Sequence, residues 1–175
     1  MLHQSIAQLK GDLRGRLIQK ADFDYDEARK LYNGMIDKRP LLIARCADVA
    51  DVVAAVNFGR ENNLRVAVRG GGHNGPGLGS VDDGLVIDMS LMKGVRVDPD
   101  QRTVRVQSGV LLGELDQETQ AFGLAVPSGI VTPPGVAGLT LGGGIGWIMR
   151  KHGLSVDQLV SVDLVTAEGE FVKAS

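Results

Sequence analysis

The stretch LRVAVRGGGHNGPGLG, residues 64–79, runs from an alternating apolar strand directly into a loop in which six of ten residues are glycine. Gly70, Gly72 and Gly75 formally satisfy the G-x-G-x-x-G pattern of dinucleotide-binding turns. That pattern requires a helix to begin in the loop, because the N-terminus of the helix holds the pyrophosphate. The continuation NGPGLGSVDDG cannot begin a helix. The sequence therefore argues against a doubly wound dinucleotide-binding fold.

A glycine-rich loop can also bind phosphates without a helix, because successive backbone N–H groups with no Cβ between them can converge on an anion. Arg69, at the end of the preceding strand, would add a charged donor. The chain has 24 glycines, and 13 of them lie in two stretches, the first glycine loop (residues 70–79) and the second glycine region (residues 129–146). Two such segments suit a long ligand, and the alternative is that the first is a mobile surface loop.

The elements around these glycines predict an α+β fold. Asp48 is expected to cap a helix that begins at Val49, and a second helix is expected over residues 110–122. Strands are predicted at residues 41–45, 64–69, 84–89, 94–98 and 103–108, and a hairpin at residues 161–174. The strands over residues 84–108 follow one another without helices, which predicts a meander rather than a series of βαβ units.

Composition excludes several classes of function. The 175 residues are 43% apolar and carry a net charge of −2, which gives no general attraction to nucleic acid or to anionic membranes. No apolar run approaches the ~18 residues that span a bilayer. The first residues lack the pattern of a secretory signal, so a cytoplasmic location is expected. The single cysteine, Cys46, lies among apolar neighbours and is expected to be a buried, inert thiol.

Three ordered motifs carry a resemblance to a known family: RPLLIARCADVADVVAAVNFGRENNLRVAVRGGGHN (39–74), GLVIDMSLMKGVRVDP (84–99) and GLTLGGGIGWIMRKHGLSVDQLVSVDLVTAEGE (138–170). With them the chain resembles the FAD-binding domain of the vanillyl-alcohol oxidase and p-cresol methylhydroxylase superfamily. Within it, the likeness is greatest to berberine-bridge-enzyme-like FAD-linked oxidoreductases and 6-hydroxy-D-nicotine oxidase. The resemblance implies an N-terminal segment (1–36) and a two-subdomain FAD-binding domain (37–175), incomplete at its C-terminus and without the family's substrate domain.

The resemblance also implies which residues bind FAD. In the first glycine loop, backbone N–H groups would wrap the pyrophosphate, and the positions are Arg69, Gly70, Gly71, Gly72, His73, Asn74 and Gly79. His73 matches the histidine that bonds through a ring nitrogen to the 8α-methyl carbon of the flavin. The alternative for His73 is a histidine that is only hydrogen-bonded within its loop. The contacts implied in the second region, on the ring and ribityl side, are Pro127, Gly129, Gly138, Thr140, Gly142, Gly143 and Gly146.

Other positions are expected to have no part in the chemistry. Val131 stands where some relatives carry a second, cysteine link to the flavin, so only one link is expected. Ile148 and Met149, next to Trp147, are expected to pack in the core. His152, in the turn RKHGL, is expected to be structural. Asp82 and Asp83 are adjacent and are interpreted as turn residues, and no metal site is expected.

The function implied by the resemblance is oxidation of a small organic substrate, with hydride transfer to flavin N5 and usually dioxygen as the electron acceptor. In relatives a substrate domain supplies the cavity and usually the general base, so no catalytic residue is assigned in this chain. The 175 residues alone are expected to be inactive, and their exposed apolar surface is expected to give an oligomer or a poorly soluble monomer. The alternative hypothesis is a truncated flavin-binding fragment with no catalytic role.

Overall fold

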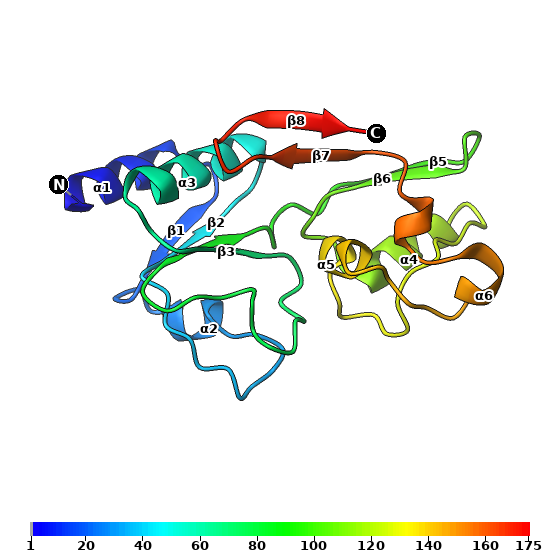
Figure 1. Cartoon of the computed structure of the whole chain (residues 1–175), viewed down its shortest axis with the longest axis horizontal. Coiled ribbons are helices and arrows are strands. Elements are labelled where there is room, and N and C mark those ends of the chain that lie inside the picture. The colour runs from blue at the N-terminus through cyan, green and yellow to red at the C-terminus, as the bar shows by residue number, and fades with distance from the viewer. Residues whose placement is uncertain (1) are drawn as a thin grey trace.

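The computed structural model describes residues 2–175 and shows two subdomains side by side (Figure 1). The first subdomain (residues 2–92) is built on a four-stranded sheet in the order β1-β2-β4-β3. Strand β1 is antiparallel to β2, and β4 is parallel to both β2 and β3. The strands are β1 (Arg16–Gln19), β2 (Leu42–Arg45), β3 (Val66–Arg69) and β4 (Leu85–Asp88).

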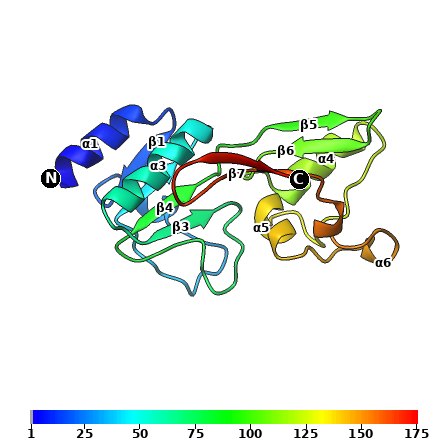
Figure 2. The same cartoon turned by 45° about the horizontal axis from the view of Figure 1, so that its top comes forward.

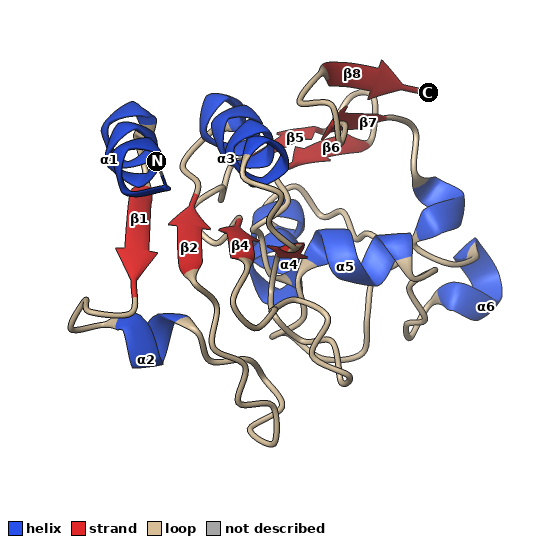
Figure 3. Cartoon of the chain, turned by 60° about the vertical axis from the view of Figure 1, so that its left-hand side comes forward, coloured by secondary structure: helices blue, strands red, loops and turns tan. Residues whose placement is uncertain are grey.

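Helices cover both faces of this sheet, as Figure 3 shows. Helices α1 (Leu2–Asp12) and α3 (Val49–Glu61) lie on one face, and the short α2 (Tyr25–Ala28) lies on the other. Neighbouring residues of a strand point to opposite faces. In β2, Leu42 and Ala44 therefore pack in the core with α1 and α3, whereas Ile43 packs with α2. The sheet is buried from both sides, and β4 is buried at every position.

The second subdomain (residues 93–175) has a smaller core under the hairpin of β5 (Val95–Asp98) and β6 (Thr103–Val106). Buried residues of α4 (Leu112–Gln120) and its surroundings form this core: Val110, Leu112, Leu115 and Val136. Short helical elements follow at α5 (Val136–Leu141), α6 (Met149–His152) and η1 (Val156–Gln158). The chain ends in a hairpin of β7 (Val162–Val165) and β8 (Phe171–Ala174), which runs back towards α3 (Figure 2).

The predicted α+β class is confirmed. The helix predicted to begin at Val49, the helix predicted over residues 110–122 and the C-terminal hairpin are also present, as α3, α4 and the pair β7–β8. Helix α3 begins after Asp48, whose side chain accepts a hydrogen bond from the Asp51 N–H as an N-cap. The predicted meander over residues 84–108 is wrong. Strand β4 pairs with β2 and β3 in the parallel part of the sheet, and only β5 and β6 form a hairpin. The continuous apolar run of β4 is typical of a strand covered on both faces, whereas β5 alternates.

Residues of the N-terminal segment form part of the first subdomain. Strand β1 makes one edge of the sheet, α1 supplies Ile6 and Leu9 to the core, and Leu13 follows directly after the helix. The loop after α2 reaches the first glycine loop, where Tyr32 N–H donates to the Gly72 carbonyl at 3.1 Å. The structure thus packs α1, β1 and α2 into the first subdomain, and the boundary at residue 36 stays a prediction.

Candidate functional site

A groove of about 390 Å³ lies where the two subdomains meet. One wall is the end of β3 and the first glycine loop, and the other is the start of α5. The lining residues are Val68, Arg69, Gly70, Gly71, Gly72, His73, Asn74, Leu78, Gly79, Pro134, Gly135, Gly138 and Leu139. The groove therefore brings together every predicted site residue of the first loop and, from the second region, Gly138.

The two walls touch through backbone atoms at Gly71 and Gly135. A Cβ added to Gly71 would lie 2.3 Å from the Gly135 nitrogen, and one added to Gly135 would lie 2.4 Å from the Gly71 nitrogen. Both distances are far inside van der Waals contact, so only glycine fits at either position. Backbone bonds attach this wall to the start of α4, from Leu112 N to the Pro134 carbonyl and from Val136 N to the Val110 carbonyl, both 2.9 Å. We call this close backbone contact between Gly71 and Gly135 the joint.

Five successive backbone N–H groups of the first loop have no partner. Within residues 2–175, the N–H groups of residues 70–74 donate to no backbone or side-chain acceptor, and all five residues line the groove. Residues 70–73 are half-buried and Asn74 is exposed, so these donors are accessible to a ligand. A run of such donors with little side chain between them makes a concave binding site for an anion. The donors fit a phosphate or pyrophosphate group.

The loop that carries these donors is attached to the segment after α2. The Asn33 side-chain amide donates to the Gly75 carbonyl at 2.9 Å. The Lys38 ammonium donates to the carbonyls of Gly77 and Ser80 at 2.8 and 3.0 Å. Together with the bond from Tyr32 N–H, these contacts hold the loop at four carbonyls, whereas its N–H groups at residues 70–74 stay free. This arrangement argues against the alternative of a mobile surface loop.

The methylenes of Arg69 lie against the first glycine loop, and its guanidinium is not a charged donor in the groove. Its guanidinium is buried and donates to the Asp88 carboxylate at 2.9 Å and to the Ala28 carbonyl at 2.7 Å. A Cβ added to Gly72 or Gly79 would lie 3.5 or 3.6 Å from the methylenes of Arg69. The expectation that Arg69 offers a charge to the ligand is therefore wrong, because its guanidinium is bonded to the Asp88 carboxylate and to the Ala28 carbonyl.

Asp88 in turn stays ionised because of this pair. Burial raises the pKa of Asp88, but the charge and hydrogen bond of Arg69 and the N–H of Ser90 outweigh burial and hold the pKa below its usual range. Arg45 adds a second guanidinium at 3.2 Å from the same carboxylate oxygen. The ends of β2, β3 and β4 are thus joined by one buried carboxylate.

His73 lies half-buried at the groove, with one ring face covered. Its imidazole stacks on the ring of Tyr32, with the ring centroids 3.7 Å apart and the planes inclined by 19°. In the described part of the chain, neither ring nitrogen of His73 takes part in a hydrogen bond or an ion pair. The alternative of a histidine that is hydrogen-bonded within its loop therefore has no support in the structure, and both nitrogens are available to a ligand.

Comparison with known proteins agrees with this geometry. Residues 40–175 match the sequence model of the family described as FAD binding domain. The chain belongs to this family. It is 36% identical over 163 residues to (R)-6-hydroxynicotine oxidase of Paenarthrobacter nicotinovorans, covering 93% of this chain and 36% of the relative. It is 41% identical over 174 residues to an FAD-linked oxidoreductase of Dictyostelium discoideum, covering 98% of this chain and 38% of the relative.

Solved structures show the same FAD-binding domain. The crystal structure of 6-hydroxy-D-nicotine oxidase from Arthrobacter nicotinovorans matches with a TM-score of 0.92 and 36% identity, over 93% of this chain and 36% of that one. BBE-like 1 of Physcomitrella patens matches with a TM-score of 0.90 and 32% identity, over 99% and 37%. The resemblance inferred from the motifs is confirmed. The chain spans a little over a third of the length of these relatives.

In this FAD-binding domain, most of the predicted contacts of the second region lie outside the groove. A Cβ on Gly129 would lie 2.7 Å from Leu112 Cδ1, and one on Gly146 would lie 1.5 Å from the Ser128 carbonyl oxygen, so packing alone requires these glycines. The Thr140 hydroxyl donates to the Val136 carbonyl at 2.8 Å within α5. The predicted contacts that do not line the groove are Pro127, Gly129, Thr140, Gly142, Gly143 and Gly146. Their contact with the flavin stays a prediction.

Sequence reasoning missed part of the groove wall. Pro134, Gly135 and Leu139 line it, as do Val68 and Leu78. The run PPGVAG, residues 133–138, was a signal, because a proline pair followed by a glycine marks a chain reversal before a helix. What it did not reveal is that Gly135 lies against Gly71.

Several side chains outside the groove also bear on the predictions. Cys46 is fully buried, as expected, and burial followed by the charges of Asp51 and Asp88 raises the pKa of its thiol to about 12. The expectation that Ile148 and Met149 pack in the core is wrong, since they are 38% and 36% exposed beside a Trp147 that is 80% exposed. This apolar surface suits the expected self-association, which stays a prediction.

The polar residues that were set aside lie in turns. The carbonyl of His152, at the end of α6, accepts a hydrogen bond from the Gln158 side chain, which is a structural role. Asp83 has a positive φ of 52° and Asp82 accepts the Arg39 N–H at 2.7 Å, as turn residues do. Among residues 2–175, no three His, Cys, Asp or Glu side chains come together as a metal site. No helix in this range is long and apolar enough to cross a membrane.

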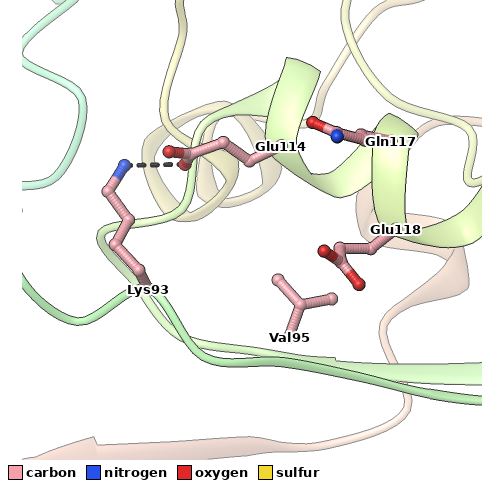
Figure 4. Close-up of a pocket in the computed structure, with 5 residues that line it drawn as sticks. All are labelled: Lys93, Val95, Glu114, Gln117 and Glu118. Carbon is pink, nitrogen blue, oxygen red and sulfur yellow. Dashed lines mark hydrogen bonds and ion pairs between the residues drawn. The ribbon is translucent and has the colours of Figure 1, made fainter.

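A second hollow of about 340 Å³ lies between β5 and α4 and is lined by Lys93, Val95, Glu114, Gln117 and Glu118 (Figure 4). Lys93 and Glu114 face each other across it in an ion pair of 2.6 Å. The same Glu114 oxygen accepts the Leu111 N–H at 2.7 Å and so caps α4. Lys93 and Glu114 neutralise each other, and Glu118, which also lines the hollow, has no ion-pair partner within residues 2–175. The groove at the first glycine loop is the candidate functional site.

Proposed function

We propose that this chain is the flavin-binding module of an FAD-linked oxidase, in which FAD lies in the groove and is covalently bonded to His73. The observation that carries the proposal is the groove itself, in which five free backbone N–H groups stand next to a histidine with two free ring nitrogens. The N–H groups of residues 70–74 would hold the pyrophosphate. Because Gly71 and Gly135 have no side chains and no room for one, no side chain at these two positions would stand between the donors and the phosphates. The flavin, when bound, supplies the hydride-accepting atom N5.

In the proposed link, a ring nitrogen of His73 would be bonded to the 8α-methyl carbon of the flavin. The imidazole N–H hydrogen and one methyl hydrogen would be lost as two protons and two electrons, for which dioxygen would be the acceptor, giving hydrogen peroxide. The nucleophile would be the neutral form of the imidazole. Tyr32 covers one face of the ring, and both nitrogens lie at the ring edge, free to react.

We propose further that the complete oxidase moves a hydride from a small organic substrate to flavin N5, with dioxygen as the usual acceptor. The names of the relatives, an oxidase and FAD-linked oxidoreductases, support this class of reaction. Their greater length supports a substrate cavity built outside the 175 residues. This chain alone would then bind FAD without saturable turnover of alcohols, amines or sugars, because positioning of the substrate supplies much of the rate.

The test is flavin fluorescence of the denatured protein on a gel. The unmodified chain is expected to give a fluorescent band after FAD is added, and His73→Ala is expected to give none. His152→Ala is the matched control, because His152 is an exposed histidine outside the groove and should leave the band unchanged. Flavin that washes out of the unmodified denatured chain would refute the covalent link. Failure of the native chain to retain FAD on a desalting column would refute binding as well.

A further inference from the structure

Within residues 2–175, the ring of Tyr32 stacks on His73, whose ring nitrogens make no hydrogen bond or ion pair. The two rings are nearly parallel at 3.7 Å, within the range of favourable aromatic pairs. Histidines that react usually have one ring nitrogen held by a hydrogen-bond partner, which sets the orientation of the ring. Within residues 2–175 His73 has no such partner, so the stack with Tyr32 takes that place.

The position of Tyr32 is itself set by the backbone of the glycine loop. Its N–H donates to the carbonyl of Gly72, the residue before His73, at 3.1 Å. The next residue, Asn33, donates to the carbonyl of Gly75 at 2.9 Å. These two bonds lie on either side of the stack and fix its register along the loop. Of the two residues that flank His73, Gly72 has no side chain, and the Asn74 side-chain oxygen accepts the Leu78 N–H at 2.9 Å rather than bonding to the His73 ring.

The stack is not a consequence of burial. Tyr32 is 68% exposed, so it adds little to the core of the first subdomain. Its hydroxyl makes no hydrogen bond to any residue in the described range 2–175. The ring face is therefore the part of Tyr32 that contacts His73, and phenylalanine would supply the same face.

We propose that Tyr32 is a positioning residue for flavin attachment, holding the His73 ring with its nitrogen edge towards the groove. The inference rests on the proposed covalent link at His73 and goes beyond it, because it assigns a function to a residue outside both glycine segments. An aromatic pair of this kind shifts an orientation equilibrium roughly 2- to 12-fold. Loss of the stack should slow attachment by that factor and leave reversible FAD binding unchanged.

The experiment follows covalent attachment with time, by gel fluorescence, after saturating FAD is added to the flavin-free chain. Tyr32→Leu is expected to slow attachment about 2- to 12-fold, whereas Tyr32→Phe is expected to keep a rate within about twofold of the unmodified one. Phe23→Leu is the matched control. Phe23 is an aromatic residue of the same subdomain, 94% exposed, whose ring lies over Arg16 and not over the loop.

Reversible affinity is measured separately, in chains that cannot form the link. The dissociation constant for FAD should agree within about twofold between His73→Ala and the double variant His73→Ala with Tyr32→Leu. Attachment by Tyr32→Leu at the unmodified rate would overturn the inference, as would a Tyr32→Phe rate as low as that of Tyr32→Leu. A weaker affinity of the double variant would assign Tyr32 a role in shaping the groove instead. Absence of attachment in the unmodified chain would refute the link itself, a result distinct from these.

Discussion

Replacing Gly71 by alanine tests whether the contact between the subdomains builds the groove. A Cβ at this position would lie 2.3 Å from the Gly135 nitrogen and 2.8 Å from its Cα. Ordinary contact begins at 3.4 Å, so the two backbones would have to separate by about 1 Å, the difference of the two distances (3.4 − 2.3). Neither partner is the end of a flexible side chain, and no rotation can relieve the contact. The strain must therefore move one wall of the groove.

The expected magnitude follows from the cost of inserting a methyl group into a packed contact, about 1–3 kcal/mol. For a protein of this size, such a loss corresponds to a fall in Tm of about 2–12 °C. Moving the wall also displaces the free N–H groups of residues 70–74 from the start of α5. Loss of one hydrogen bond to a charged group costs about 1.5–3 kcal/mol, so FAD affinity should fall at least about tenfold.

The assays are thermal unfolding of the flavin-free chain and titration with FAD. Gly75→Ala is the control, because a Cβ at Gly75 meets nothing within 4 Å and its φ is not positive. Alanine at such a position should leave stability unchanged or raise it by about 0.4–1 kcal/mol. If Gly71→Ala unfolds at the temperature of Gly75→Ala and binds FAD equally well, the joint at Gly71 and Gly135 does not build the site.

Three further predictions concern single residues. Cys46 has a pKa raised to about 12 by burial, so a thiol reagent at pH 8 should label it only in denaturant and leave flavin attachment unchanged; rapid labelling of the folded chain would contradict its burial. The pKa of Asp88 is lower in the folded chain than its unfolded value of ~3.9, so its contribution is present above about pH 4 and is lost as pH falls through the folded pKa. Asp88→Asn should lower the free energy of unfolding by about 3–5 kcal/mol at pH 7 and flatten the pH dependence of the urea midpoint below pH 4. An unchanged pH profile would refute the ion pair with Arg69. Gly138→Ala has free space for its methyl group inside α5 and should stabilise the flavin-free chain by up to about 1 kcal/mol. It should nevertheless weaken FAD binding, because Gly138 lines the groove. An FAD affinity that is not weakened would place the cofactor elsewhere.

Local features of the chain could be predicted where the cause is local. Residues within a few positions of each other determine three of these features: the cap at Asp48, the alternating strand before the glycine loop and the apolar face of α4. The exclusion of a helix after residue 75 depended only on proline and glycine content. The pairing of β4 was predicted wrongly, because a short apolar run does not specify its neighbours in the sheet. Partner choice is set by the helices that cover both faces.

The sequence by itself determined the family and the α+β class, and it predicted the first glycine loop as a phosphate-binding segment and His73 as the residue bonded to the flavin. Only the tertiary structure decided how these parts form a site. It places Gly71 against Gly135, turns the charge of Arg69 towards Asp88 and sets Tyr32 on the face of His73. The reason is physical. Each of these contacts joins segments that are distant in the chain, and its geometry depends on how the sheet, the loop after α2 and the second subdomain pack together.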